Sequence, residues 1–310
     1  KLFALKPPGV SHKIKIERKL LKTLGNMLGA GENMQKACRL SVLPVSLFEK
    51  MASGEITLRE WLDEAKKMGL DAADISLMLL REHTPTYLGR VKQTIAEAGI
   101  PIAMASTYPD FTHPDAMQRE RELEYLQGDI AVCSALQISF LRVLAGQAHP
   151  DTRRDEGVRW AVEMLRRAAV TAQKFGVTLV YEDHYKPGAW DYVDFSFPTD
   201  VFLEIYQSLK GSGVRVNFDT GNITAYGGDP LEVLEQVYDD VATIHISDMA
   251  QKGKFQPVVI GTGATPNGQV LAFLKKKDFN GLICIEEASG TGYDGIRKAV
   301  AYVRKAWETA

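Results

Sequence analysis

Residues 177–184 read VTLVYEDH, a short apolar run that ends in charge. Residues 177–181 have the apolar and β-branched character of a buried strand. Glu182, Asp183 and His184 follow directly, and charged groups are costly to bury unless they have a partner. The stretch therefore predicts a core strand whose carboxyl end lies at a polar site.

The same alternation of short apolar runs and amphipathic segments extends from about residue 36 to the end of the sequence. The first predicted helix begins at Thr57, and the T-x-x-E spacing of Thr57 and Glu60 is that of a capping box. The predicted strands are ACRLSVLPV (37–45), DAADISLML (71–79), IPIAMAS (100–106), ISFLRVLAG (138–146), VTLVYED (177–183), VRVNFD (214–219), VATIHIS (241–247) and GLICIEE (281–287). Eight strand–helix units predict a parallel α/β sheet that closes into a single (β/α)8 barrel. We expect a short N-terminal extension, residues 1–35, followed by one barrel domain, residues 36–310.

An open, doubly wound sheet is the main alternative for such a pattern. It would need a glycine-rich phosphate-binding turn, and no G-x-G-x-x-G follows the first or second predicted strand. The length of 310 residues, with 45% hydrophobic and 25% charged residues, also suits one large barrel. The sequence therefore favours the closed barrel.

The net charge and the cysteines bear on partners and compartment. A net charge of −2 gives no electrostatic basis for binding nucleic acid or an anionic membrane. No run of about 18 apolar residues is present to span a bilayer. Cys38, Cys133 and Cys284 form no paired motif and are expected to be buried thiols in a reducing compartment. We therefore expect a cytoplasmic protein that binds neither nucleic acid nor membranes.

The last four predicted strands share a feature at their carboxyl ends. They end in VYED, VNFD, TIHIS and CIEE, which places one possible metal ligand on each: Glu182, Asp219, His245 and Glu286. One such residue alone is equally well explained as a helix cap, an ion pair or a core histidine. Four at equivalent positions favour a shared site, because the carboxyl ends of barrel strands meet at one mouth.

A divalent cation would resolve the electrostatic problem that this set creates. Three neighbouring carboxylates repel one another and raise each other's pKa strongly. Three oxygen ligands and one imidazole suit Mn²⁺, Mg²⁺ or Co²⁺ better than a thiolate-rich zinc site, although Zn²⁺ is also compatible. We predict one divalent metal ion, with Mn²⁺ preferred.

These residues also carry a resemblance to a known family. A strand ending in Glu, a strand followed by D-T-G-N, a strand with H-I-S-D and a last strand ending in Glu together resemble the xylose-isomerase-like TIM-barrel superfamily of sugar phosphate isomerases and epimerases. Gly261 and Gly263, in VVIGTGATP, match the tight loop that follows the histidine strand in that family. The resemblance covers the chain from about residue 37 and implies four metal ligands: Glu182, Asp219, His245 and Glu286.

The resemblance implies roles for further residues around the metal. His184 matches a position that contacts substrate, and Arg142 and Asp74 match polar positions facing the barrel mouth. Asp248, in HISD, is implied to orient the histidine ligand or a basic partner. Asn222 stands where several members of the family have histidine, and we expect it on the substrate side.

Two charged neighbours of the expected ligands need separate consideration. Glu287 is adjacent to Glu286, and strand parity alone does not decide which of them is the fourth ligand. Asp183 lies on the opposite face of its strand from Glu182 and is expected to be structural.

A divalent metal beside two glutamates suits chemistry at a carbon next to a carbonyl group. The metal would polarise the carbonyl, and Glu182 and Glu286 would remove and return a proton through an enediolate. This predicts a metal-dependent sugar isomerase or epimerase acting on a ketose, an aldose or a related carbonyl compound. The same enediolate can lose a neighbouring hydroxyl, so a lyase acting on an inosose-, keto-glycoside- or dehydroshikimate-like substrate is the alternative.

The loops indicate the kind of substrate. Tyr108 and Trp190 follow predicted strands and are expected to stack on a sugar, and the aromatic loop 185–198 favours a lid. No Arg–Lys cluster marks a phosphate site, which favours a non-phosphorylated sugar, cyclitol or sugar-derived acid. An apurinic endonuclease-like phosphodiesterase on the same fold is a less favoured alternative, since it would need many strand-end histidines and the chain has six in all. Family habit further suggests a homo-oligomer, either a dimer or a tetramer.

Overall fold

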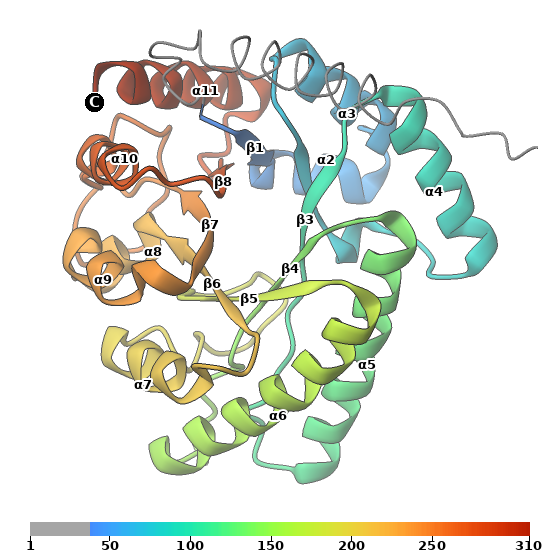
Figure 1. Ribbon diagram of the computed structural model, residues 1–310, viewed down its shortest axis with the longest axis vertical. Helices are drawn as coiled ribbons and strands as arrows, with labels where there is room; N and C mark the ends of the chain where they lie inside the picture. The colour runs from blue at the N-terminus through green and yellow to red at the C-terminus, as the bar shows by residue number, and fades with distance from the viewer. Residues whose placement is uncertain (1–37) are drawn as a thin grey trace, which may run out of the picture. The chain divides into compact units, whose positions relative to one another are not determined.

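The computed structural model describes residues 38–310, in which eight parallel strands lie at the centre of a ring of helices (Figure 1). The predicted extension, residues 1–35, lies outside the described residues. The strands are β1 (Leu40–Leu43), β2 (Ala73–Ser76), β3 (Ile102–Ser106), β4 (Phe140–Val143), β5 (Thr178–Glu182), β6 (Arg215–Asp219), β7 (Val241–Ile246) and β8 (Leu282–Glu286). Each falls inside one of the eight predicted strands, so the (β/α)8 barrel is confirmed.

The sheet is almost closed into a barrel. Each strand pairs with the next along the chain from β2 to β8, and β1 pairs with β8, which sets Leu43 opposite Glu286. Between β1 and β2 the backbone N–H groups of Asp71 and Ala72 donate to the carbonyl of Leu40, at 2.9 and 3.3 Å. This arrangement brings all eight carboxyl ends to one rim.

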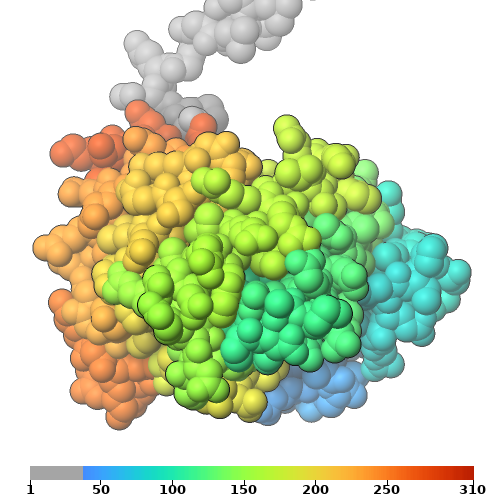
Figure 2. Space-filling view, turned by 90° about the horizontal axis from the view of Figure 1, so that it is seen from below, coloured from blue at the N-terminus to red at the C-terminus, as the bar shows by residue number. Residues whose placement is uncertain are grey.

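Helices cover the outside of the strands. They are α2 (Phe48–Ser53), α3 (Leu58–Lys67), α4 (Pro85–Ala98), α5 (Ala116–Leu136), α6 (Arg154–Phe175), α7 (Thr199–Leu209), α8 (Thr220–Tyr226), α9 (Pro230–Val237), α10 (Asn267–Lys276) and α11 (Gly292–Thr309). The capping box at the start of α3 is confirmed: Thr57 Oγ1 accepts from the N–H of Glu60 at 3.2 Å, and Glu60 Oε2 accepts from the N–H of Thr57 at 2.8 Å. Figure 2 shows the middle of the chain, in green and yellow-green, side by side on one face, where α5 and α6 pack together. Within residues 38–310, no helix has the length and apolar run needed to cross a bilayer.

Two apolar clusters stabilise the barrel. The larger one fills the space between strands and helices, with Trp61 and Phe202 fully buried. The smaller one lies inside the barrel and consists of Leu43, Met104, Val180 and Cys284. Cys38, Cys133 and Cys284 are free thiols, and burial raises the pKa of Cys38 to about 12.

Polar side chains inside the barrel satisfy one another below the rim. Asp74 accepts from Ser41 Oγ at 2.5 Å and from the N–H of Met104 at 2.9 Å. Thr243 Oγ1 donates to Asn217 Oδ1 at 2.6 Å. The interior is therefore a packed, hydrogen-bonded floor on which the side chains of the rim rest.

Candidate active site

The four predicted ligands come together at the rim of the barrel. Glu182, Asp219, His245 and Glu286 stand at or near the carboxyl ends of β5, β6, β7 and β8, and one ligand atom from each lies within 4.8 Å of the others. Parallel pairing of β6 with β7 sets Asp219 directly opposite His245. The first three are buried and Glu286 is partly exposed. This cluster, called the cage below, could hold one metal ion.

The donor atoms of the cage fit a cation. His245 Nδ1 lies 2.6 Å from Glu182 Oε1 and 2.9 Å from Glu286 Oε2, so the imidazole lies between two carboxylates. Burial lowers the pKa of His245, but the charge of Glu182, with further contributions from Cys284 and Glu286, outweighs burial and leaves that pKa well above its usual value. The cage therefore attracts positive charge to the point on which its ligand atoms converge.

Glu182 is held from inside the barrel by one hydrogen-bond donor and one ion pair. Asn217 Nδ2 donates to Glu182 Oε1 at 2.5 Å, and Arg142 Nε lies 3.2 Å from Glu182 Oε2. Burial raises the pKa of Glu182, but His245 and Arg142 outweigh burial and lower it overall. Glu182 is thus an ionised carboxylate of fixed orientation, completely shielded from solvent.

Glu286 differs from Glu182 because its side chain is 15% exposed and lines an open cavity. Its neighbour Glu287 accepts from the hydroxyl of Ser46 and from the N–H of Ser289 at 3.0 Å, so it links the segments after β1 and β8. The adjacent acids therefore have separate places, and Glu286 is the member of the cage.

Asp219 is fixed by the start of α8. Its carboxylate accepts from the N–H of Asn222 at 2.6 Å and from Ser247 Oγ at 2.9 and 3.1 Å. A Cβ on Gly221 would collide with Ser247 Oγ, which explains the glycine in the D-T-G motif. Burial, followed by the charges of Glu286 and Glu182, raises the pKa of Asp219 well above its usual value.

A cavity of about 440 Å³ opens beside the cage. Four of the predicted substrate contacts line it: Tyr108, Arg142, His184 and Asn222. His184 Nδ1 is buried without a hydrogen-bond partner. Burial, with the charge of Arg142, lowers the pKa of His184 to about 4, so the imidazole is neutral near pH 7. The Arg142 guanidinium lies over the ring of Tyr108, 4.6 Å from its centre.

Three further predicted site residues have other surroundings in the structure. Asp74 is fully buried in the barrel floor, and Trp190 is buried and lies outside the lining of the cavity. Asp248, predicted to orient the histidine ligand, lines the cavity but accepts from the N–H groups of Gly261, Gly263 and Thr265 at 2.9, 2.9 and 3.1 Å. Its bonds therefore stabilise the loop after β7, and a Cβ on Gly263 would collide with its carboxylate.

Asn217 and Ser247 orient two of the ligands, and the sequence alone gives them no role. Asn217 precedes Asp219 by two residues on β6, and Ser247 follows His245 by two. Because residues two apart share a face of a strand, this spacing is the signal that could have found them.

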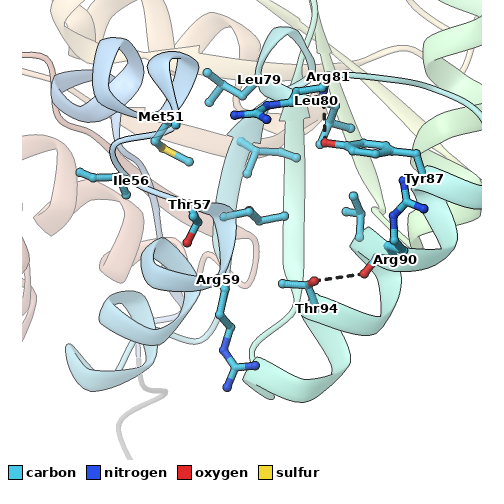
Figure 3. A pocket seen from close by; sticks show the side chains of 14 residues that line it. Met51, Ile56, Thr57, Arg59, Leu79, Leu80, Arg81, Tyr87, Arg90 and Thr94 are labelled. Carbon is cyan, nitrogen blue, oxygen red and sulfur yellow. Dashed lines mark hydrogen bonds between the residues drawn. The ribbon is translucent and has the colours of Figure 1, made fainter.

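A second cavity, of about 350 Å³, lies on the outside of the barrel between α2–α3 and α4 (Figure 3). Its wall combines apolar side chains such as Met51 and Leu80 with the arginines Arg59, Arg81 and Arg90. No acid, histidine or cysteine is among the described residues that line it. This second cavity therefore lacks the acid and imidazole groups that the cavity beside the cage contains.

Comparisons with known proteins agree with this architecture. The family model described as xylose isomerase-like TIM barrel matches residues 62–306. The putative L-ribulose-5-phosphate 3-epimerase SgbU of Haemophilus influenzae is 22% identical over 258 residues, covering 78% of this chain and 87% of that protein. The inosose dehydratase of Geobacillus kaustophilus is 23% identical over 280 residues, covering 80% of this chain and 86% of that protein. Among solved structures, a D-tagatose 3-epimerase-like protein matches with a TM-score of 0.72 and 16% identity, over 87% of this chain and 97% of that one.

Proposed function

Since this chain belongs to the xylose isomerase-like TIM barrel family, we propose that it is a metal-dependent enzyme that epimerises or isomerises a sugar. The observation that carries the proposal is the cage beside an open cavity, with Glu286 as its partly exposed member. The names of the two relatives, a 3-epimerase and a dehydratase, support chemistry at a carbon next to a carbonyl group.

The four residues of the cage, Glu182, Asp219, His245 and Glu286, are the proposed ligands of one divalent ion. Three carboxylates and one imidazole favour Mn²⁺, and Mg²⁺, Co²⁺ and Zn²⁺ are compatible with the same donors. When bound, the ion would stabilise the negative charge that develops on the substrate's carbonyl oxygen.

Glu286 is the proposed base, because its carboxylate faces the cavity. It takes the proton from the carbon next to the carbonyl, becoming a carboxylic acid while the substrate becomes an enediolate. Return of a proton to the opposite face of the same carbon gives an epimer, and return to the adjacent carbon gives an isomer. Glu182 is the proposed second acid–base group: because its carboxylate is ionised, it first takes a proton from a substrate hydroxyl and then returns that proton to the carbon.

The remaining lining residues bind and orient the substrate in this proposal. The unpartnered Nδ1 of His184 is available to a substrate hydroxyl. Asn222 donates its Nδ2 to the carbonyl of Asp183 at 3.1 Å, which orients its Oδ1 as an acceptor. Arg142 and Tyr108 form one wall. Three further residues act indirectly in this proposal. Trp190 supports the loop 185–198, Asp74 supports the barrel floor, and Asp248 supports the loop after β7.

A lyase is the second candidate, and the difference between the two glutamates favours it. Glu182 is enclosed by Asn217 and Arg142, whereas Glu286 faces the cavity. Elimination needs only one such group: Glu286 removes the proton, the enediolate expels a neighbouring hydroxyl, and Glu286 returns the proton to that oxygen as water leaves.

The two reactions are separated by incubating the Mn²⁺-loaded enzyme in D₂O with ketoses, aldoses, inososes and dehydroshikimate-like acids. An epimerase or isomerase incorporates deuterium into the sugar, as seen by NMR, whereas a lyase gives a product lighter by one water. Glu286→Gln is expected to lower either activity by about 10³-fold. The matched control, Glu287→Gln, changes a neighbouring acid that lies outside the cage and should retain activity.

Retention of activity by the Glu286→Gln variant would overturn the assignment of the base. Absence of both deuterium incorporation and water loss across all four substrate classes would overturn the enzyme class. We further propose a cytoplasmic homo-oligomer, a dimer or a tetramer, which light scattering on the purified full chain would test.

A further inference from the structure

Polar groups in the active-site cavity are concentrated at its inner end. Asp219, Glu286, His184, Asn222 and Arg142 all line that end, next to the cage. A monosaccharide carries a hydroxyl on nearly every carbon, and each buried hydroxyl needs a hydrogen-bond partner. The inner end provides such partners for one sugar ring.

Much of the remaining lining of the same cavity is apolar. Phe48 and Met78 come from the segments after β1 and β2, and Met249, Phe255 and Pro257 from the segment after β7. Met78 is 57% exposed and Phe255 is 37% exposed, an unusual arrangement for two large apolar side chains at one opening. We call these five residues the apolar wall.

Phe255 is held rigidly as part of this wall. Its ring stacks on that of Tyr185, with centres 4.2 Å apart and planes 18° apart. Tyr185 packs edge-on against Phe197, which packs edge-on against Tyr226. The backbone of the loop is pinned as well, because Ala250 donates to the carbonyl of Gln256 at 2.9 Å. The exposed ring is thus pre-organised, which lowers the entropy cost of binding against it.

Permanent positive charge is scarce in the lining of this cavity, whose basic side chains among the described residues are Arg142 and Lys186. Arg142 pairs with Glu182 at 3.2 Å, and Lys186 Nζ donates to the carbonyl of Asp191 at 3.0 Å. A phosphate group would need unengaged cations or a backbone nest. A second sugar ring would leave its hydroxyls without partners against the apolar wall.

We propose that the apolar wall binds an apolar group attached to the sugar, so that the substrate is a sugar carrying an aryl or similar apolar substituent away from the reacting carbonyl. This inference rests on the proposed function of the cage and names the substrate class of the same site. The sugar ring lies at the polar end, its substituent stacks on Phe255, and Met78 covers the opposite side.

The test uses phenyl and methyl 3-keto-β-D-glucopyranoside in D₂O with the Mn²⁺-loaded enzyme. Both compounds carry an exchangeable C–H next to a carbonyl, so exchange into the methyl compound tests the proposed function alone. The ratio of kcat/KM between the two tests the apolar wall. We expect the phenyl compound to be favoured by at least about tenfold, and Phe255→Ala to remove most of that preference.

The matched control is Phe175→Ala, which removes an exposed phenylalanine at the end of α6, away from the cavity, and should keep the preference. Equal kcat/KM for the two compounds, or an undiminished preference in Phe255→Ala, would overturn the inference while leaving the proposed function standing. The inference would also be overturned if the ratio of kcat/KM for L-ribulose 5-phosphate over L-ribulose exceeded the ratio for the phenyl over the methyl compound.

If no compound exchanges, calorimetric binding of phenyl and methyl β-D-glucopyranoside decides the inference separately. Tighter binding of the phenyl compound supports it, and equal binding overturns it.

Discussion

The two halves of the barrel are built alike but contribute differently to the site. Strands β5 to β8 each bring one ionisable ligand to the rim. Strands β1 to β4 end at Leu43, Ser76, Ser106 and Val143, and their main charged contribution to the cage is Arg142, which pairs with Glu182. The segments after β1 and β2 supply Phe48 and Met78 of the apolar wall. The second half thus carries the proposed chemistry, while the first half compensates charge and shapes the cavity.

The largest effect is expected from Arg142, the side chain of the first half that pairs with Glu182 of the second half. Arg142→Met removes the guanidinium from the fully buried Glu182 and leaves His245 as its remaining charged partner. Breaking a buried pair in this way costs about 3–5 kcal/mol of unfolding free energy. Chemical denaturation of the metal-free protein measures this loss.

Mn²⁺ should restore part of that stability, because it supplies the cage with another positive charge. The matched control is Arg153→Met, since Arg153 is exposed and pairs with the exposed Asp155 at 3.1 Å. A loss in Arg142→Met no greater than in the control would show that the first half contributes no charge compensation.

A smaller effect is expected from Asn217, which holds a ligand from within the second half. Asn217→Ala removes the donor to Glu182 Oε1, and loss of such a supporting bond costs about 10–100-fold in metal affinity. Titration calorimetry with Mn²⁺ measures the change. Ser106→Ala, at the end of β3 in the first half, removes a buried hydroxyl that has no hydrogen-bond partner and should leave the affinity unchanged. If the two variants bound Mn²⁺ with equal affinity, the second half would not differ from the first in its support of the metal ligands.

The last effect is on the pH dependence of stability and concerns Asp194, where the loop after β5 meets the loop after β4 through the Gln147–Asp194 bridge. Burial raises the pKa of Asp194 to about 8, although Ser196 donates to it through its N–H at 2.7 Å and its hydroxyl at 2.6 Å. The folded state therefore holds a proton that the unfolded state releases near its usual pKa of about 4. This contribution to stability is present below about pH 4 and falls as pH rises to about 8, by up to about 1.4 kcal/mol per pH unit.

Thermal unfolding of the wild type and of Asp194→Asn between pH 5 and pH 8 checks this sign. The variant should lose less stability than the wild type as pH rises, and Asp191→Asn, at an exposed position in the same loop, should follow the wild type. A steeper decline in Asp194→Asn would contradict the assignment of the proton to this carboxyl group.

Strand-borne features of the molecule were predictable from the sequence. Eight apolar runs were enough to define the barrel, and Glu182, Asp219, His245 and Glu286 were visible because each comes at the end of such a run. Helix α8 escaped prediction because TGNITAY contains weak helix formers, and its start depends on capping by Asp219.

Loop-borne features depend on contacts that no local pattern encodes. Trp190 has the composition of a substrate contact, but the fold buries it outside the cavity lining. Phe255 enters the cavity because it stacks on Tyr185, which lies 70 positions earlier in the sequence, so neither segment alone indicates the contact. The partners of Asp248 are backbone N–H groups of a folded loop, and these likewise have no sequence signature.

The central claim is that the second half of the barrel binds one divalent ion through the cage. The direct measurement is the metal content of the full chain after chelation, reloading with Mn²⁺ and removal of excess, by mass spectrometry of the digested protein. The prediction is one Mn²⁺ per chain for the wild type and for His113→Gln, which changes a histidine outside the cage, and far less than one for His245→Gln. No Mn²⁺ above background in the wild type, or an equal content in His245→Gln, would contradict it.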